Sequence, residues 1–132
     1  MNVRNGRMRT PSPYLAIDET LFPWRGRIGF KQYNPNKPAK YGLFYRSLCD
    51  STIIYTYSSL PYAGKPEIVE GDAAKYYVTG TDEYTKCLVS SFKEHGNLDG
   101  CNISMDRYFT SIPVAIWGHV EKISIVGTMK HN

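Results

Sequence analysis

Two aspartates follow short apolar runs, and their carboxylates are the side chains whose placement could support chemistry. Asp18 comes after "YLAI" within residues 14–22, and Asp106 comes after "ISM" within residues 103–111. If the strands that carry them are neighbours, the two carboxylates would lie about 5 Å apart, the ordinary strand spacing. Two anions at that distance repel each other unless one holds a proton or a cation bridges them.

A bound divalent cation would offset the repulsion between the two carboxylates. Oxygen ligands in small number suit Mg²⁺ or Mn²⁺, which keep bound waters and accept substrate phosphates as further ligands. Such a site activates water or a 3′-hydroxyl and stabilises the leaving oxygen in phosphodiester chemistry. In the other interpretation Asp18 and Asp106 merely end strands near turns, and the spacing alone favours this structural role. Glu19 points to the opposite side of the strand from Asp18, so we expect it to be structural.

The hydrophobic pattern predicts the elements that must position the two aspartates. Strands are predicted at residues 14–22, 39–50, 51–62, 101–107 and 122–128. The segments 23–38 and 63–80 are interrupted by Pro and Gly, which indicates loops. In residues 81–96, Tyr84, Leu88 and Phe92 recur at helical spacing, and residues 111–121 are the second predicted helix.

Residues that favour helix starts precede both predicted helices. Thr81 is the expected N-cap of the first helix, and Asp82 and Glu83 suit its positive end. Ser111 is the expected N-cap of the second helix, with Pro113 in its first turn.

The element order β-β-β-α-β-α-β predicts an α/β domain with a mixed sheet and helices on its faces. Strands 102–106 and 122–128 flank a helix, and a right-handed crossover would make them parallel. Ligands of open sheets bind beyond the carboxyl ends of the strands. Asp106 is expected at such an end, and Asp18 at or near one. The strand of Asp18 is apolar on both sides before the acid, as expected of a central strand covered on both faces.

The charge of the chain is uneven, which bears on its partners. Residues 1–49 hold nine Lys or Arg against two acids, a net charge of +7, whereas residues 50–132 carry −3. A basic half of this kind suits DNA or RNA, although a solvated basic face without a partner would have the same composition. Residues 1–13 are expected to form a flexible basic arm. No long apolar run or secretory signal occurs, and the three widely spaced cysteines favour reduced thiols in an intracellular protein without a membrane partner.

Longer stretches carry a family resemblance. The segments "AIDETLFPWRGRIGF" and "NKPAKYGLFYRSLCDS", followed in order by "YAGKPE", "ISMDRYFTSIPVA" and "VGTMKHN", strongly resemble the piggyBac-type transposases and their domesticated relatives. The resemblance covers roughly residues 14–132. It implies an RNase H-like fold with a DDD (DDE-type) site, in which Asp18 and Asp106 are the first two catalytic carboxylates and metal ligands.

The resemblance also implies a function on DNA. Family members cut and rejoin DNA with two Mg²⁺ ions and without a covalent protein–DNA intermediate, so Mg²⁺ or Mn²⁺ is the expected cofactor, DNA the expected partner and the nucleus the expected location. The basic residues expected to contact phosphates are Arg25, Arg27, Lys31, Lys37 and Lys40. Trp24 and Tyr33 could stack on bases, but packing in the core or loop is favoured for both. Cys49 and Asp50 are expected to shape the hairpin after residues 39–50.

The sequence departs from the family pattern in ways that affect the expected activity. The third family carboxylate lies downstream, beyond an inserted domain, and the sequence ends at Asn132. Residues 14–132 are therefore expected to be a partial RNase H-like core, truncated before the last core helix and inactive alone. Its exposed apolar surface would favour self-association. The alternatives are a domesticated, non-catalytic DNA-binding or protein-interaction module, and an α/β domain without a nucleic-acid partner.

Overall fold

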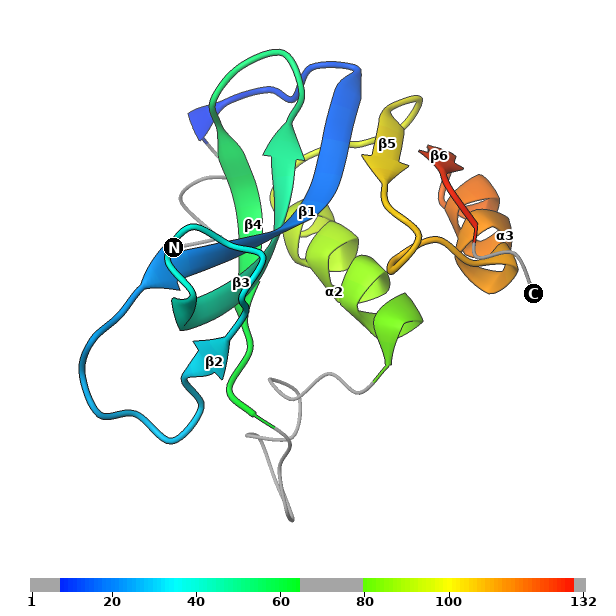
Figure 1. The fold of residues 1–132 in the computed structure, drawn as a ribbon. Coiled ribbons are helices and arrows are strands. Elements are labelled where there is room, and N and C mark those ends of the chain that lie inside the picture. Colours follow the sequence, from blue (N-terminus) through cyan, green and yellow to red (C-terminus); the bar gives the residue numbers. More distant parts are fainter. Residues whose placement is uncertain (1–7, 65–79, 130–132) are drawn as a thin grey trace, which may run out of the picture.

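One six-stranded sheet organises the chain, and Figure 1 shows it in a computed structural model that describes residues 8–64 and 80–129. Its strands are β1 (Tyr14–Pro23), β2 (Gln32–Tyr33), β3 (Tyr41–Asp50), β4 (Thr56–Pro61), β5 (Asn102–Met105) and β6 (Ser124–Gly127). The sheet carries the helices α2 (Thr81–Lys93) and α3 (Ile112–Val120). This succession agrees with the predicted one, and the two-residue strand β2 lies inside the predicted loop 23–38, where at most short extended pieces are expected.

The sheet is mixed, as the sequence predicts. Its order is β2-β3-β1-β5-β6, and β4 pairs with β3 on the edge opposite β1. The pairings of β3 with β1, β2 and β4 are antiparallel, whereas β1 with β5 and β5 with β6 are parallel. The parallel pair β5–β6, joined through α3, confirms the predicted crossover.

Helix α2 packs on one face of the sheet and closes the main core. Leu88 and Phe92, two members of the predicted helical stripe, are buried, and the ring of Phe92 lies 5.1 Å from that of Tyr57 on β4. The buried hydroxyl of Ser58 donates to the carbonyl of Leu88 at 2.8 Å, so it keeps a partner inside the core. Burial of each large apolar side chain here contributes about 1.5–3 kcal/mol.

Strand β1 is central, between β3 and β5, but one of its faces is open in the described residues. Leu15 and Ile17 are buried in the core, whereas Tyr14 is 59% exposed and Asp18 is exposed on the other face. The expectation that both faces are covered is therefore wrong for this part of the chain. The strand also continues past Asp18 to Pro23, because β3 pairs with it along that length, so Asp18 lies in mid-strand.

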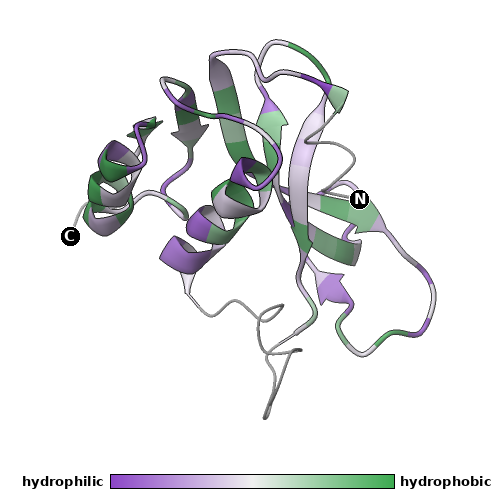
Figure 2. Ribbon diagram, turned by 180° about the vertical axis from the view of Figure 1, so that it is seen from behind, coloured by the Kyte–Doolittle hydropathy of each residue, from purple (hydrophilic) through white to green (hydrophobic). Residues whose placement is uncertain are grey.

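Helix α3 lies against β6, and Gly118 permits the close approach. A Cβ at Gly118 would lie 2.5 Å from Ile125 Cδ1, so a larger residue would push the helix away. On the outside of α3, Ile112, Ile116 and Val120 recur at helical spacing and are 60%, 63% and 71% exposed. Figure 2 shows α3 as a largely hydrophobic helix at one edge of the molecule. An apolar stripe of this kind is typical of an interaction surface.

The two helices begin differently. Ser111 caps α3 as predicted, because its Oγ accepts from the N–H of Val114 at 3.2 Å, and Pro113 lies in the first turn. The predicted N-cap of α2 is wrong: the cap is Gly80, not Thr81, and no side chain caps the helix. Gly80 turns the chain into α2 with a φ of 101°, a value that glycine adopts readily.

Within the described ranges, no helix combines the length and hydropathy required to cross a bilayer. The three cysteines, Cys49, Cys87 and Cys101, are free.

A buried carboxylate fixes the start of β1 to the hairpin between β3 and β4. Asp50, 7% exposed, accepts hydrogen bonds from the N–H and hydroxyl of Ser12, from the N–H and hydroxyl of Thr52, and from the hydroxyl of Tyr57. Burial alone would raise the pKa of Asp50, but the hydrogen bonds from Thr52 and Ser12 outweigh it and hold the pKa well below its usual value. Asp50 therefore shapes the hairpin, as expected, and also anchors Ser12.

Replacement of this carboxylate tests the anchor. Asp50→Asn should lower the free energy of unfolding by about 2–3 kcal/mol, because an amide cannot accept all these donors. The wild-type contribution is present above the unfolded-state pKa of about 3.9 and is lost as pH falls through the lowered folded-state pKa. Urea unfolding between pH 3 and 7 measures both effects, with Glu94→Gln as an exposed control. Equal stability of Asp50→Asn and wild type across this range would contradict the anchor.

Candidate active site

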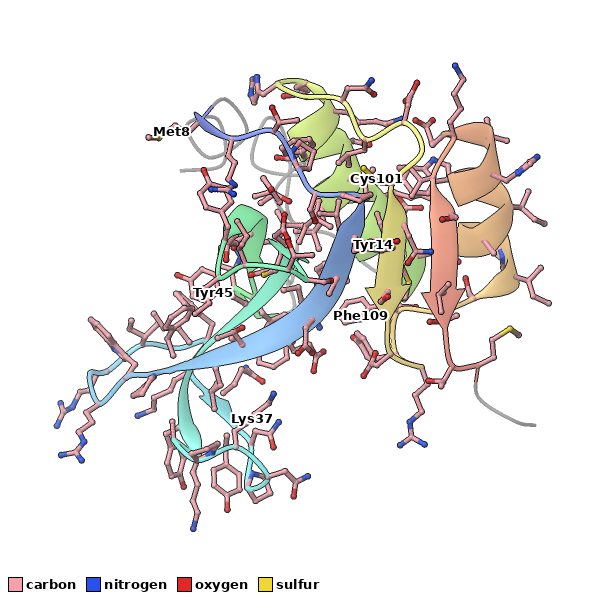
Figure 3. All side chains as sticks on the ribbon, turned by 90° about the horizontal axis from the view of Figure 1, so that it is seen from above. Met8, Tyr14, Lys37, Tyr45, Cys101 and Phe109 are labelled. Atoms are coloured by element: carbon pink, nitrogen blue, oxygen red, sulfur yellow. The ribbon has the colours of Figure 1, made fainter. Side chains whose placement is uncertain are left out.

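The parallel register of β1 and β5 brings Asp18 beside Asp106. Ile17 pairs with Met105, and an aspartate follows each of them directly. Adjacent strands lie about 4.8 Å apart, so the two aspartates start from neighbouring backbone positions. Both are exposed, and Figure 3 shows Phe109, just beyond Asp106, at the end of β5 beside β1. The strands that carry the two acids are thus neighbours, the condition on which the hypothesis from the sequence depends.

A backbone N–H orients one oxygen of each carboxylate. The N–H of Glu19 donates to Asp18 Oδ1 at 2.7 Å, and the N–H of Tyr108 donates to Asp106 Oδ1 at 2.9 Å. The turn after β5 is held further by Thr110 Oγ1, which donates to the carbonyl of Asp106 at 2.7 Å. Within the part of the chain that the structure describes, no hydrogen bond reaches the second oxygen of either aspartate. Each carboxylate therefore keeps one oxygen for a ligand.

Glu19 lies on the other face of β1 and pairs with a different group. Its Oε1 is 3.9 Å from Nε of Arg46, an ion pair in keeping with the structural role expected for it. Burial raises the pKa of Glu19; the positive charges of Arg46 and Lys37 oppose this increase, and the negative charges of Asp106 and Asp18 add to it. Both aspartates therefore lie near enough to act on the same carboxyl group.

Arg46, which pairs across from Glu19 on β3, is a buried cation. It is 5% exposed, and its guanidinium carbon lies 3.8 Å from the ring centre of Tyr84. Three further rings lie 5.2–5.5 Å away, those of Phe44, Tyr62 and Tyr108. Nε and Nη1 are buried and have no hydrogen-bond partner among the described residues. The aromatic faces, rather than a full set of acceptors, stabilise this charge.

Tyr108 connects this buried cation to the site. Its hydroxyl accepts a hydrogen bond from Arg46 Nη2 at 3.0 Å, while its N–H orients Asp106. A movement of Arg46 would therefore shift Tyr108 and, through its N–H, change the orientation of the Asp106 carboxylate.

Sequence reasoning missed this arrangement. Arg46 is one of the six basic residues that the sequence holds between Glu19 and Asp50, and neither it nor Tyr108 was predicted to lie at the site. Alternation along β3 could have revealed the burial, because it places Arg46 on the same side as Leu48 and Asp50.

The basic residues predicted to contact DNA lie on the connections around β2. Four of them are exposed, namely Arg25, Arg27, Lys31 and Lys40. Lys37 is half-buried, and its Nζ donates to the carbonyl of Glu19 at 3.2 Å. Figure 3 shows Lys37 at the outer end of the sheet, far along β1 from Tyr14. This basic surface therefore begins next to the strand that carries Asp18.

The donor set fits a hard divalent cation held by few protein ligands. No group of three or more His, Cys, Asp or Glu side chains suited to a metal occurs in residues 8–64 and 80–129. Two neighbouring carboxylates with a free oxygen each supply the ligands that Mg²⁺ and Mn²⁺ prefer. Mg²⁺ commonly binds through one or two carboxylates and takes waters or phosphates at its other positions.

Comparison with known proteins agrees with the resemblance seen in the sequence. The family model described as Transposase IS4 matches residues 1–132. The cryo-EM structure of a piggyBac transposase synaptic complex with hairpin DNA is similar at 36% sequence identity, with a TM-score of 0.72. The match covers 93% of this chain but 24% of that one, so the chain spans about a quarter of the length of that transposase. The expected RNase H-like fold and the resemblance to piggyBac-type transposases are confirmed.

A double-mutant cycle tests the link between Arg46 and Tyr108. Tyr108→Phe should cost about 1 kcal/mol of stability, because it removes the acceptor of Arg46 Nη2. Arg46→Lys should cost on the order of 2 kcal/mol, since an ammonium lacks the flat face that lies over Tyr84. Urea unfolding of the singles and the double should give a coupling energy of about 1 kcal/mol.

The exposed ion pair Lys86–Glu83 on α2 is the matched control for this cycle. Its coupling energy should stay below about 0.5 kcal/mol, as is usual for exposed pairs. Additive effects of the Arg46 and Tyr108 changes would contradict the link.

Proposed function

The chain belongs to the Transposase IS4 family, and we propose that Asp18 and Asp106 hold a divalent metal ion for the cleavage and transfer of DNA strands. The proposal rests on the pairing of β1 with β5. Ile17 lies opposite Met105 on these parallel strands, and the next residue in each case is an aspartate, Asp18 or Asp106. The similarity to an RNase H-like transposase domain supports it.

The proposed site works through preorganised carboxylates. Asp18 and Asp106 would hold the ion through their free oxygens, where its positive charge would offset the repulsion between the two carboxylates. The N–H groups of Glu19 and Tyr108 fix the other oxygens, so little reorientation is needed when DNA arrives. Bound Mg²⁺ or Mn²⁺ supplies Lewis-acid activation of a water or 3′-hydroxyl at the phosphodiester.

We infer that residues 1–132 alone do not catalyse strand transfer. The family pattern implies a third carboxylate, and the described residues hold no group of three metal-ligating side chains. Two protein ligands would bind one ion weakly, and two-metal chemistry needs more ligands than this pair supplies. Asp18 and Asp106 are therefore proposed as one metal-binding part of a DDE-type centre. The isolated chain should bind the metal ion weakly.

DNA is the proposed partner and the nucleus the proposed location. Support comes from the exposed cations around β2 and from the similar transposase, whose structure is a complex with hairpin DNA. Arg25 and Arg27 would hold phosphates through their planar guanidinium groups, and the lysines would add point charges. These contacts position the backbone and carry no sequence information.

A second candidate is a non-catalytic DNA-binding or protein-interaction module. The exposed stripe of Ile112, Ile116 and Val120 on α3 favours it, because apolar residues gathered on one helix face are suited to a protein contact. Self-association through this stripe is the simplest form of that contact. The same basic surface would serve DNA binding in either candidate.

Metal binding separates the two candidates. Mn²⁺ at ten times its dissociation constant should stabilise the chain by about 1.4 kcal/mol, a shift of a few degrees in Tm. Asp18→Asn and Asp106→Asn should each abolish the shift, whereas Asp99→Asn, on a loop, should retain it. Differential scanning fluorimetry measures all four proteins. If Mn²⁺ does not raise the Tm of the wild type, or still raises it in the Asp18 and Asp106 variants, the proposed metal site is wrong.

DNA binding should depend on salt through the exposed arginines. The slope of log K against log salt concentration should become shallower by about two in the double variant Arg25→Gln/Arg27→Gln, about one per lost phosphate contact. Fluorescence anisotropy with duplex DNA over 50–200 mM salt gives the slope. Lys122→Gln, remote from β2, is the control, and Asp18→Asn should still bind. An unchanged slope in the arginine variant would exclude these residues as phosphate contacts.

A further inference from the structure

A pair of exposed tyrosines lies within the basic surface. Tyr33 on β2 pairs across from Tyr41 on β3, and their ring centres are 4.7 Å apart at an angle of 38°. The packing expected for Tyr33 is thus present, yet Tyr33 remains 57% exposed and Tyr41 54% exposed. Each ring therefore contacts the other and still offers aromatic surface to a ligand.

Cations surround this pair. Lys31 Nζ lies 5.7 Å from the ring centre of Tyr41, Lys40 precedes Tyr41 in the chain, and both lysines are exposed. The sequence contains no acid between Glu19 and Asp50. A ligand for this surface must therefore combine negative charge with flat rings.

The connection between the two strands that carry the tyrosines also contacts β1. Lys37, on the connection between β2 and β3, donates to the carbonyl of Glu19 and lowers the pKa of that residue, in opposition to burial.

We propose that Tyr33 and Tyr41 form a stacking platform for unpaired bases of DNA; this inference rests on the DNA-binding function proposed above. In a duplex the flat face of each base is stacked on the neighbouring base pair, so exposed rings beside a duplex would contribute little. Unpaired bases present their faces, and stacking on an aromatic side chain is sequence-tolerant because every base has such a face. The lysines hold the backbone of the same strand.

Trp24 lies outside the tyrosine pair. Its ring packs over Gly26, where a Cβ would lie 2.6 Å from the indole nitrogen, and it remains 43% exposed. The proposed platform consists of the two tyrosines whose rings contact each other.

The test compares one oligonucleotide as a single strand and as a duplex. The wild-type chain should bind the single strand more tightly, by fluorescence anisotropy at fixed salt. Tyr33→Leu/Tyr41→Leu should weaken single-strand binding about tenfold or more and change duplex binding less than twofold. Tyr33→Phe/Tyr41→Phe, which keeps both rings, should retain wild-type affinity.

Two controls define the outcomes. Tyr14→Leu removes a tyrosine of similar exposure, 59%, at the opposite end of β1 and should leave both affinities unchanged. Loss of single-strand and duplex binding to the same extent in the leucine double variant would overturn the platform, as would no loss of either. If the wild type bound neither DNA at low salt, the proposed DNA-binding function itself would fail, and the platform with it.

Discussion

The pairing of β1 with β5 is the constraint on which the rest of the candidate site depends. Side chains alternate between the two faces of a strand, so a slip of one position in the pairing would move every side chain of that strand to the opposite face. Leu15 and Ile17 on β1 and Ile103 and Met105 on β5 are all buried in one core, which fixes the register against such a slip. The aspartates that follow are placed by this hydrophobic contact, and their mutual repulsion is offset by burial elsewhere in the sheet.

Support for the site comes from the core side of the sheet. Arg46 brings a positive charge against Glu19 and holds the hydroxyl of Tyr108, whose N–H orients Asp106. The aromatic rings around Arg46 compensate for the two buried nitrogens that lack acceptors. Tyr108 accepts a hydrogen bond from Arg46 and orients Asp106 through its own N–H. A buried guanidinium of this kind lowers the local cost of gathered negative charge and fixes geometry at the same time.

The sequence predicted those parts of the structure that rest on periodicity. The order of elements along the chain, the two helices and the parallel crossover followed from apolar alternation and handedness. That the strands before Asp18 and Asp106 are neighbours was a hypothesis, which the pairing of β1 with β5 supports. The resemblance, which the comparisons confirm, supplied the family and the fold name. The catalytic roles of the two aspartates stay a prediction, as does the boundary between residues 1–13 and 14–132.

What the sequence did not reveal depends on tertiary contacts. Asp18 lies in mid-strand rather than at or near a strand end, because β1 pairs with β3 as far as Pro23. The cap at Gly80 is set by a backbone turn that composition did not indicate. The burial of Arg46 needs four rings from four segments. Whether Asp18 and Asp106 share one divalent cation can be seen in crystals grown with Mn²⁺. We expect one anomalous peak about 2.1 Å from an oxygen of each carboxylate. A peak bound to one aspartate alone, or to neither, would contradict the shared site.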